Sequence, residues 1–420
     1  MNDSTAINSS RLMRVAFLGN VNNHPFIVCQ HLKDKGVDTL FFVEADSQNK
    51  LYRPESTGLV NYPYPAWINE VPQFQHAHVM HLPHIFAKNI IDQVNNCDAV
   101  VLNDFAHRLV PHLRKDLIKI CMFTGGDLEI MGDFENVQQM KLNSAKLKLV
   151  PHFIKKMYAR YSVMQLRNAI KQADLIGYFP VGLNPVGDKI LNEIFEGKPF
   201  SKYSHWCIML DGFNYTPPPK NKKIRLLNLA RFIWQQPFPA GTSALENKRN
   251  DIMIDGIGLF LKAYPGTLDV HFINKGIHVE ASKALIEKNN FTDAVTWHEE
   301  MPLTALSAEI EKADIVFDQL GEHLIGAGII GMAKGRPLIA NARPEILQQV
   351  STGPIPVCHA TNPQEVFEWL KKLVFDEDLR IQTGIRCSKF AFAFMDIRNE
   401  SDYYYNFIKN KSLSKNKVLQ

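Results

Sequence analysis

Residues 311–340 read EKADIVFDQLGEHLIGAGIIGMAKGRPLIA, and this stretch decides the fold. A short apolar run, Asp314–Asp318, is followed by a glycine-rich helical segment, Gly326–Lys334, and by a second apolar run, Pro337–Ala340. Short apolar runs between charged and turn residues are typical of strands that are buried on both faces in parallel sheets. The stretch therefore predicts a strand–helix–strand unit within one parallel sheet.

The same alternation continues on both sides of this stretch. In the second half we expect further strands at Ile224–Ala230, Leu268–Asn274 and Ala294–Trp297, and helices at Asp251–Tyr264, Glu280–Asn289, Pro302–Lys312 and Pro363–Phe375. In the first half we expect a helix at His24–Lys35 and strands at Met13–Gly19, Thr39–Ala45, Ala99–Asn103, Ile118–Phe123 and Leu175–Phe179. Repeated alternation of this kind predicts an α/β protein with doubly wound sheets.

The alternation is interrupted once, at residues 217–223, where PPPKNKK predicts a stiff, basic linker. A chain of 420 residues accommodates two or three domains at about 150 residues each. We therefore expect an N-terminal Rossmann-like domain at 1–216, a linker at 217–223 and a C-terminal Rossmann-like domain at 224–395. Residues 396–420 are expected to form a C-terminal helix, which can return to the first domain, and a frayed tail.

The composition excludes several classes of protein. Forty-seven Lys and Arg against 43 Asp and Glu leave a net charge of +4, too small an excess to imply a nucleic-acid partner. The six cysteines form no C-x-x-C pair, which argues against a disulfide framework and a zinc ribbon. No secretory signal is recognisable, and no apolar run approaches the ~18 residues of a membrane span. We therefore expect a cytoplasmic protein.

The usual nucleotide-binding fingerprints are absent. The loop after the first expected strand reads GNVNNHPF, 19–26, instead of G-x-G-x-x-G, and no G-x-x-x-x-G-K-[ST] occurs. A plain dehydrogenase and a P-loop enzyme are therefore disfavoured. Two doubly wound domains in tandem would instead place the carboxyl ends of two parallel sheets across one cleft, where we expect the ligand to bind.

Several segments of the second half carry a resemblance to a known family. In order, they are LLNLARFIW (226–234), NKRNDIMIDGIGLFLKAYP (247–265), VHFINKGIHVEASKALIEKNNFTDAVTWHEEM (270–301) and residues 311–340. Together they resemble the donor domain of family 4 glycosyltransferases, which are retaining enzymes of the two-Rossmann GT-B fold. GNVNNHPFIVCQHLKDKGVD (19–38) and FTGGDLE (123–129) look like the acceptor-side glycine loop and the H-G-S-D-L segment of that family. The resemblance implies a GT-B enzyme that uses a nucleotide-sugar donor.

On the donor side, the resemblance implies that Arg231 and Lys248 stabilise the diphosphate leaving group. No D-x-D motif follows a strand, so we expect no metal requirement and no cofactor, with cationic side chains and helix N-termini meeting the developing charge. Gly326 and Gly328 would let backbone amides approach an anion closely, although tight helix–sheet packing accounts for them almost as well. A surface ion pair for Arg231 and a solvated loop position for Lys248 are the structural alternatives.

The family's most diagnostic device is a pair of glutamates eight positions apart, and this chain departs from it. Glu322 occupies the first place, toward the donor sugar, and Ile330 the second, toward the ribose hydroxyls. A carboxylate accepts hydrogen bonds from two hydroxyls, and an isoleucine accepts none. Ribose recognition has therefore moved, or the donor is a deoxythymidine nucleotide, or catalysis is impaired; a one-residue gap would also misplace Glu322.

The first loop is the expected start of the acceptor side. Gly19 joins the first strand to the loop and is a candidate for donor-phosphate binding, and Asn22, Asn23 and His24 are candidates for holding the acceptor. Runs of asparagine are also ordinary turn formers, so the loop has an equally good structural interpretation.

The segment FTGGDLE supplies the second acceptor-side group. Gly126 and Asp127 follow an expected strand, and Asp127 is the best candidate for a carboxylate that meets the acceptor, with a helix N-cap as the alternative. The family often has a histidine that contacts the donor sugar where this chain has Thr124, which puts that contact in doubt.

Two further sequence features have weaker interpretations. HAHVMHLPH, 76–84, contains four histidines, but Pro83 interrupts their spacing and no carboxylate or cysteine is nearby, so we assign no metal site. Residues 141–171 contain eight basic residues and no acidic one, with apolar residues at helical spacing. A basic amphipathic helix predicts peripheral association with the inner membrane face, and packing on the protein's own sheet is compatible with it.

These observations lead to one expectation about function and two alternatives. We expect a metal-independent glycosyltransferase that moves a sugar, most often from a UDP- or GDP-sugar, to a hydroxyl of a glycan or a lipid-linked acceptor, with retention, in cell-surface polysaccharide or glycolipid synthesis. The alternatives are a nucleotide-sugar epimerase on the same fold and a catalytically degenerate binding or scaffolding protein, which the isoleucine at position 330 favours.

Overall fold

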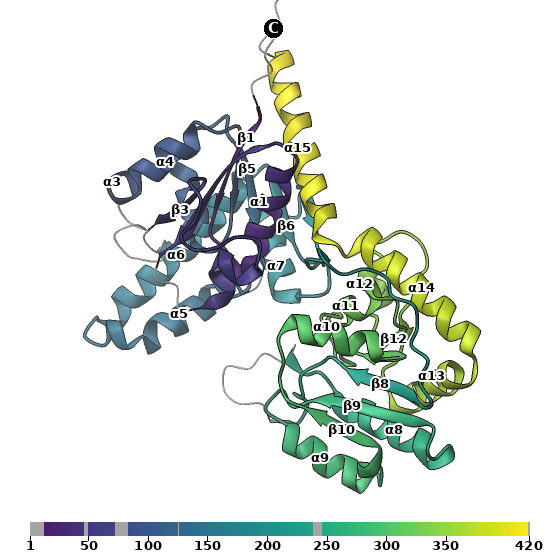
Figure 1. The fold of residues 1–420 in the computed structure, drawn as a ribbon. Helices are drawn as coiled ribbons and strands as arrows, with labels where there is room; N and C mark the ends of the chain where they lie inside the picture. The colour runs from purple at the N-terminus through teal and green to yellow at the C-terminus, as the bar shows by residue number, and fades with distance from the viewer. Residues whose placement is uncertain (1–11, 46–48, 72–82, 125, 238–245, 419–420) are drawn as a thin grey trace, which may run out of the picture. The chain divides into compact units, whose positions relative to one another are not determined.

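The computed structural model describes residues 12–45, 49–71, 83–124, 126–237 and 246–418. The chain divides into two compact α/β units (Figure 1). Unit 1 contains Met1–Trp206 and Ile397–Gln420, and unit 2 contains Cys207–Asp396. The first unit thus ends before the expected linker at 217–223, and the chain re-enters it at Ile397.

Unit 1 is built on a seven-stranded sheet in the order β3-β2-β1-β4-β5-β6-β7, in which all neighbours pair in parallel. Its strands are β1 Arg14–Leu18, β2 Asp38–Glu44, β3 Ile68–Val71, β4 Ala99–Leu102, β5 Ile118–Met122, β6 Leu175–Tyr178 and β7 Lys202–Ser204. Its helices are α1 His24–Asp34, α3 Pro83–Phe86, α4 Lys88–Asn95, α5 Phe134–Asn143, α6 His152–Lys171, α7 Pro185–Phe195 and α15 Ile397–Val418.

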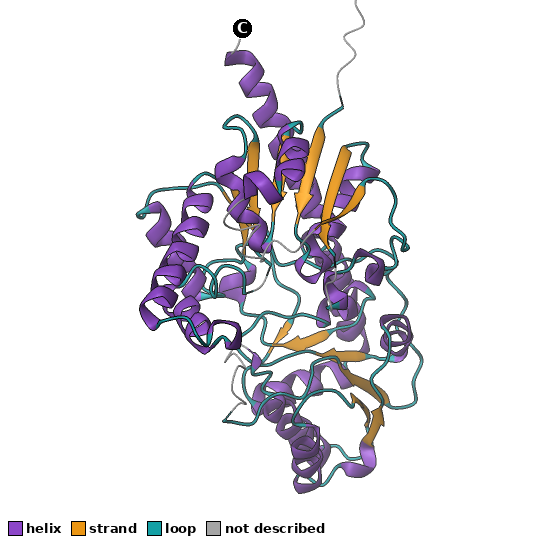
Figure 2. Ribbon diagram, turned by 90° about the vertical axis from the view of Figure 1, so that its left-hand side faces the viewer, coloured by secondary structure: helices purple, strands orange, loops and turns teal. Residues whose placement is uncertain are grey.

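Unit 2 is built on a six-stranded parallel sheet in the order β10-β9-β8-β11-β12-β13. Its strands are β8 Ile224–Asn228, β9 Leu268–Ile273, β10 Val295–His298, β11 Ile315–Phe317, β12 Leu338–Ala340 and β13 Cys358–His359. Its helices are α8 Asn250–Ala263, α9 Val279–Lys288, α10 Leu303–Lys312, α11 Gly328–Ala333, α12 Pro344–Leu347, α13 Pro363–Phe375 and α14 Glu377–Phe394. The prediction of two doubly wound parallel sheets is confirmed, as the separate strand sets in Figure 2 make visible.

Three strands lie outside the sequence-based expectations: β3, β7 and β13. Each is short and lies at the edge of its sheet, with the sequences INEV, KYS and CH. An edge strand has a partner on one side only and is partly exposed, so it needs no continuous apolar run. The central strands β1, β4 and β5 are buried almost throughout, which is why their apolar runs identified them.

In each sheet, the chain works outward from one central strand and then returns to the other side of it. This reversal occurs between β1 and β4 in unit 1, and between β8 and β11 in unit 2. At such a switch point the loops leave the carboxyl ends of the two central strands in opposite directions and leave room for a ligand. The two switch points therefore locate the candidate sites.

The C-terminal helix α15 lies along α1 in unit 1 (Figure 1). Its Glu400 is fully buried and lies between two histidines: one carboxylate oxygen is 2.7 Å from His24 Nε2, and the other is 3.3 Å from His205 Nδ1. The charges of His24 and His205 and their hydrogen bonds outweigh the cost of burial and hold the pKa of the Glu400 carboxyl well below its usual range. His24, an expected acceptor contact, thus has a buried partner inside unit 1.

Helix α6 shows the arrangement of the basic stretch. Its buried side consists of small and aliphatic residues together with Lys155. Five large apolar side chains are instead 43–67% exposed: Phe153, Ile154, Met157, Tyr161 and Met164. Lys156 and Arg160 lie exposed among them. The apolar residues that were singled out at helical spacing are therefore not the side that packs on the sheet.

Candidate functional site

Two loops meet at the carboxyl ends of β8 and β11 in unit 2, the connection from β8 to α8 and the loop after β11. The carbonyl of Ile233, in the loop after β8, accepts a hydrogen bond from the amide of Lys248 (2.6 Å), just before α8. The carbonyl of Lys248 in turn accepts a hydrogen bond from the amide of Leu320 (3.0 Å), in the loop after β11. The amide of Ile233 also donates to the buried side chain of Asn250 (3.1 Å). These bonds join the two ends of the β8–α8 connection to each other and to the loop after β11.

Arg231 and Lys248 lie on the β8–α8 connection, on either side of one carboxylate. The guanidinium of Arg231 is 2.9 Å from Glu246, and the Lys248 ammonium is 4.0 Å from the same oxygen. Arg231 is half exposed, whereas Lys248 is 14% exposed. Burial lowers the pKa of Lys248, and the charge of Arg231 lowers it further, against the attraction of Glu246 and Asp318. The structure therefore brings together the two predicted cations, and it adds Glu246, which sequence reasoning missed.

The two predicted phosphate-binding glycines have an internal partner. One carboxylate oxygen of Asp318, at the end of β11, accepts hydrogen bonds from the amides of Gly326 (2.6 Å) and Gly328 (2.9 Å). A Cβ at Gly328 would lie 2.9 Å from the Asp318 side chain, which explains the glycine by close approach. Helix α11 begins only at Gly328 and has six residues. The expected anion site on these amides thus already holds a carboxylate of the chain.

Glu322 lies further along the same loop and is 77% exposed. It is 3.0 Å from the guanidinium of Arg343, and its charge also favours the charged form of Arg249. Both arginines have left-handed backbones, with φ of 41° and 50°, which cost free energy in residues other than glycine. Sequence reasoning did not find these two arginines, because nothing in a linear pattern marks a positive φ at an arginine.

Other residues of this edge also bear on the donor side. Burial lowers the pKa of His323, and the charge of Lys248 lowers it further, so this imidazole is neutral at pH 7. Ile330 is 8% exposed within α11 and contributes an apolar side chain to the packing of that helix. The position therefore offers no hydrogen-bond acceptor for a ribose.

In unit 1 the switch point is organised around Asn103, at the end of β4. Its side-chain oxygen accepts from the amide of Val21 (2.8 Å), and its amide group donates to the Met122 carbonyl (3.0 Å), to Thr124 Oγ1 (3.2 Å) and to Asp127 Oδ2 (3.3 Å). Asn103 is fully buried, and Asp127 is 7% exposed. The predicted acceptor carboxylate is thus held in a network that joins the ends of β1, β4 and β5.

The first loop is shaped by the residues that were singled out in it. Gly19 has φ of 86°, and a Cβ there would lie 2.5 Å from the Asn103 carbonyl, so only glycine fits. Asn22 and Asn23 both have left-handed backbones, with φ of 58° and 56°. Asn23 is buried and donates to Ser56 Oγ (2.7 Å), whereas Asn22 is exposed and donates to the Thr124 carbonyl at 3.4 Å. Asn22 is therefore the asparagine of this loop that faces solvent.

Two carboxylates near Asp127 were missed from the sequence. Asp104 directly follows Asn103 and has φ of 51°. Burial raises its pKa to about 6, against a backbone hydrogen bond and the charge of Arg108. Burial also raises the pKa of Glu129, two residues after Asp127, to about 7. The position of Asp104 two residues after the fully apolar strand β4 was the signal that could have found it.

Gly126, another predicted acceptor-side residue, lies against Ile130. A Cβ at position 126 would be 2.5 Å from Ile130 Cδ1.

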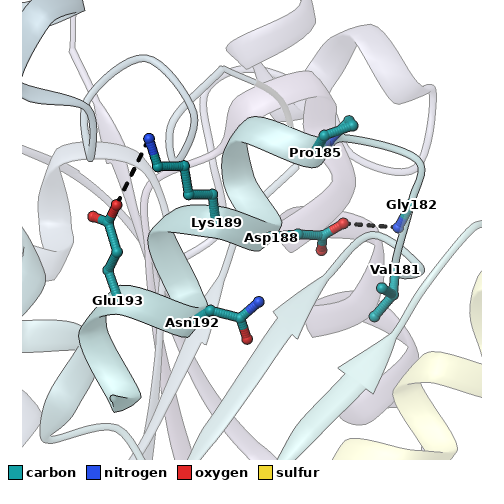
Figure 3. Close-up of a pocket in the computed structure, with 7 residues that line it drawn as sticks. All are labelled: Val181, Gly182, Pro185, Asp188, Lys189, Asn192 and Glu193. Atoms are coloured by element: carbon teal, nitrogen blue, oxygen red, sulfur yellow. Dashed lines mark hydrogen bonds and ion pairs between the residues drawn. The ribbon is translucent and has the colours of Figure 1, made fainter. Parts of the chain in front are cut away.

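A hollow of about 620 Å³ lies along α7 (Figure 3). It contains none of the predicted site residues; Asp188 in it accepts from the Gly182 amide (2.7 Å), and Lys189 is paired with Glu193 (3.9 Å).

Two sequence features concern metals and membranes. Of the histidine run at 76–84, residues 76–82 lie outside the described residues, and His84 lies in α3. Among the described helices, none combines the length and the apolar character that crossing a membrane requires.

The sequence matches no family profile and no curated protein at a significant level. Solved structures nevertheless share its fold. Sucrose-phosphate synthase from Thermosynechococcus elongatus is 11% identical with a TM-score of 0.56, and covers 95% of this chain and 99% of its own. Anabaena HepE, solved in complex with UDP and glucose, is 11% identical with a TM-score of 0.58, and covers 95% of this chain and 100% of its own.

A third solved structure extends the comparison. An alpha-glucosyltransferase in complex with UDP-glucose and DNA containing an abasic site is 12% identical with a TM-score of 0.57, and covers 95% of this chain and 100% of its own. Identities this low show the fold alone. Over nearly its whole length, this chain has the GT-B fold of these enzymes.

Proposed function

We propose that the protein is a glycosyltransferase that moves a sugar from a nucleotide-sugar donor to a hydroxyl of an acceptor. The observation that carries the proposal is the pair of cations, Arg231 and Lys248, on either side of Glu246 at the switch point of unit 2. Solved proteins of the same fold bind UDP and UDP-glucose, which supports a nucleotide donor of this class.

In this proposal, Arg231 and Lys248 bind the donor diphosphate and stabilise it as it leaves. Glu246 occupies that position in the free protein, and the donor phosphates replace it. Lys248 is largely buried, and its charge therefore acts in a medium of lower dielectric constant than water, where it interacts more strongly with a phosphate. The chemistry needs no metal ion in this arrangement, because the side-chain cations meet the developing charge.

Glu322 is proposed to orient the donor sugar. It reaches solvent, and its partner Arg343 holds the loop that carries it. The guanidinium donates to the Glu322 carbonyl and pairs with its carboxylate, while Nε of the same side chain donates to Glu345. The apolar Ile330 supports a donor without a ribose 2′-hydroxyl, a deoxythymidine nucleotide, or a ribose that is recognised elsewhere.

The acceptor side is proposed to lie at the switch point of unit 1. Asp127 and Asp104 are its carboxylates, and Asn22 with the loop from Gly19 and the turn at Gly126 completes its rim. A carboxyl group with a pKa of about 6, such as Asp104, can accept a hydrogen bond from an acceptor hydroxyl near neutral pH. A glycan or a lipid-linked sugar presents such hydroxyls, and the proposed transfer retains the anomeric configuration.

Helix α6 is proposed to hold the enzyme at an anionic membrane surface. Its exposed apolar side chains would enter the headgroup region, with Lys156 and Arg160 among the anionic lipids. Each cation near such a surface contributes about 1 kcal/mol. This association would bring a lipid-linked acceptor to the enzyme.

The first experiment is a thermal-shift panel with UDP, GDP, dTDP, CMP and NAD. A ligand at about a hundred times its dissociation constant stabilises the folded state by about 2.7 kcal/mol, which raises Tm by several degrees. We expect one nucleoside diphosphate to respond and Arg231→Ala to abolish the response. Lys312→Ala is the matched control, since Lys312 is an exposed cation of the same unit that is also paired with a glutamate.

The outcomes separate the functional classes. A response to dTDP alone would also explain Ile330. No response to any nucleotide would contradict the proposal and favour a binding or scaffolding protein. Conversion of the free donor to its epimer without an acceptor would favour an epimerase instead.

The membrane association has its own test. Vesicles of anionic and of neutral phospholipid are floated with the protein and with a Phe153→Ser, Met157→Ser double variant. We expect flotation with anionic vesicles only, lost in the variant and at high salt. Equal flotation of both proteins would contradict a role for α6.

A further inference from the structure

The loop that carries Arg231 is held by a side chain that can titrate, His278, just before α9. The Nδ1 atom of His278 accepts hydrogen bonds from two consecutive backbone amides of this loop, those of Trp234 (3.0 Å) and Gln235 (3.1 Å). One helical turn further on, Ser282 Oγ accepts from the Trp234 indole (2.8 Å). The hydroxyl of Ser282 itself donates to the His278 carbonyl (2.8 Å). Loop and helix are thus joined at three points.

Further hydrogen bonds between the loop and the turn before α9 are made by the backbone. The amide of His278 donates to the Phe232 carbonyl (3.0 Å), and the amide of Phe232 donates to the Lys275 carbonyl (2.8 Å). Gly276 allows this approach, since a Cβ there would lie 2.5 Å from the Phe232 carbonyl oxygen. None of these backbone groups titrates. The hydrogen bonds to the imidazole, by contrast, depend on a group that titrates near neutral pH.

An imidazole nitrogen that accepts two N–H groups cannot carry a proton. The contacts therefore require neutral His278 with its proton on Nε2. A proton on Nδ1 would point toward the amide hydrogens of Trp234 and Gln235 and would break both bonds. Protonation of this one ring thus removes two of the hydrogen bonds that hold the chain three and four residues after Arg231.

Several charged groups on the elements around His278 form ion pairs, and α9 also carries Glu287 and Lys288 in its last turn. Lys275, on the turn before the helix, pairs with Glu300, and Lys283 on α9 pairs with Glu280. On the loop side, Arg231 pairs with Glu246. Burial alone lowers the pKa of His278, so the ring stays neutral at pH 7 and gains its proton only in more acidic solution.

We propose that His278 is a positioning residue for the nucleotide donor: in its neutral form it holds the Arg231 loop in place, and its protonation weakens donor binding. This inference rests on the proposed function, because it requires that Arg231 binds the donor diphosphate. The attachment of the loop to His278 does not depend on that function and is measured separately.

The first measurement concerns the ring itself in the full-length protein without ligand. Long-range 1H–15N spectra of protein labelled at histidine report the tautomer and pKa of each imidazole, and the His278 signals are assigned by their loss in H278N. We expect the Nε2–H tautomer at pH 7.5 and a pKa below 6.5. A proton on Nδ1, or a pKa above 6.5, would overturn the inference.

The second measurement is the affinity for the nucleoside diphosphate found in the thermal-shift panel, between pH 7.5 and pH 5.0. Asparagine at position 278 places an acceptor oxygen near the site of Nδ1 and cannot be protonated in this range. We expect the wild type to lose at least threefold more affinity than His278→Asn over this interval. The titration of the ligand phosphate affects both proteins equally and cancels in the comparison.

His278→Ala removes the acceptor at every pH. We expect it to bind about tenfold more weakly than the wild type at pH 7.5, since two hydrogen bonds to the loop are lost. Equal affinity of the alanine variant, or equal pH dependence of the wild type and the asparagine variant, would overturn the inference. If no nucleotide binds the wild type, the proposed function fails, and the spectra still decide whether neutral His278 holds the loop.

Discussion

The two switch points have the same topology and different electrostatic character. At the end of β4 in unit 1, a fully buried asparagine organises a network of amides, a hydroxyl and the carboxylate of Asp127. At the ends of β8 and β11 in unit 2, arginines and a lysine meet glutamates in ion pairs, several of them exposed. The edge in unit 1 presents neutral and acidic groups. The edge in unit 2 carries cations, and a ligand can replace the carboxylates that pair with them.

Under the proposed function, this difference matches the two kinds of ligand, a nucleotide donor and a sugar acceptor. A nucleoside diphosphate is recognised by cations, and exposed ion pairs are worth little by themselves, so a resident glutamate is displaced at low cost. A sugar hydroxyl is recognised by neutral groups and carboxylates in a preorganised network. Under the proposed function, the donor and acceptor sides are assigned by the groups at the two switch points and not by the fold alone.

The network of unit 1 is expected to be the more sensitive of the two to a single deletion. Asn103→Ala would leave the amide of Val21 and the carbonyl of Met122 buried without this partner. We expect a loss of about 3 kcal/mol in the free energy of unfolding, measured by urea denaturation monitored by circular dichroism. Arg343→Ala, which breaks two exposed ion pairs in unit 2, is the comparison and is expected to lose less than about 1 kcal/mol. Equal losses would contradict the contrast.

Asp104 in unit 1 is a buried carboxylate whose ionisation costs free energy in the folded state. Its pKa is raised in the folded state to about 6, so the folded protein binds more protons than the unfolded chain between about pH 4 and pH 6, and stability falls as the pH rises through this range. Asparagine readily adopts the left-handed backbone found at this position, so Asp104→Asn keeps the local conformation. We expect it to stabilise the protein by about 2 kcal/mol at pH 7.5 and to make no difference near pH 4. A stability difference that does not change with pH would refute this assignment.

Lys248 tests the electrostatic role of unit 2. Lys248→Met keeps most of the buried side-chain volume and removes the charge. We expect the affinity for the responding nucleoside diphosphate to fall about tenfold, or about 1.4 kcal/mol, as measured by calorimetry, with Tm of the free protein nearly unchanged. Unchanged affinity would place the phosphates elsewhere.

Glu246 gives the smallest and most specific effect. If it holds the place of the phosphates in the free protein, Glu246→Gln removes a competing charge and should raise the affinity for the same nucleotide two- to threefold, about 0.5 kcal/mol. Glu309→Gln, in the ion pair with Lys312, is the control and should leave the affinity unchanged. A weaker affinity of Glu246→Gln would mean that the glutamate positions Arg231 for the donor.

Most of the fold could be predicted from the sequence, and the exceptions have one cause. The ten expected strands all coincide with strands of the structure, to within a residue or two at their ends, because central parallel strands are continuous apolar runs. The strands β3, β7 and β13 were missed, since an edge strand is specified by the partner it pairs with.

The candidate site divides in the same way. Arg231 and Lys248 could be named because of the resemblance of the second half to the family, and Asp127 because it follows a predicted strand in a segment with the same resemblance. Glu246 and Arg343 could not, because their role comes from contacts with residues 15 and 21 positions away that only the folded chain brings together. Asp318 likewise accepts hydrogen bonds from the amides of Gly326 and Gly328, which the sequence alone indicated as an anion site.

The sequence by itself determined the doubly wound architecture and the edges where polar residues gather, since both follow from local apolar periodicity and from residues at strand ends. The tertiary structure alone decided which of those residues are available. In the folded chain, His24 pairs with the buried Glu400, and the amides of Gly326 and Gly328 donate to Asp318. Five large apolar side chains of α6 point outward and are exposed. The physical reason is that availability depends on partners distant in the chain, and a linear pattern records only neighbours.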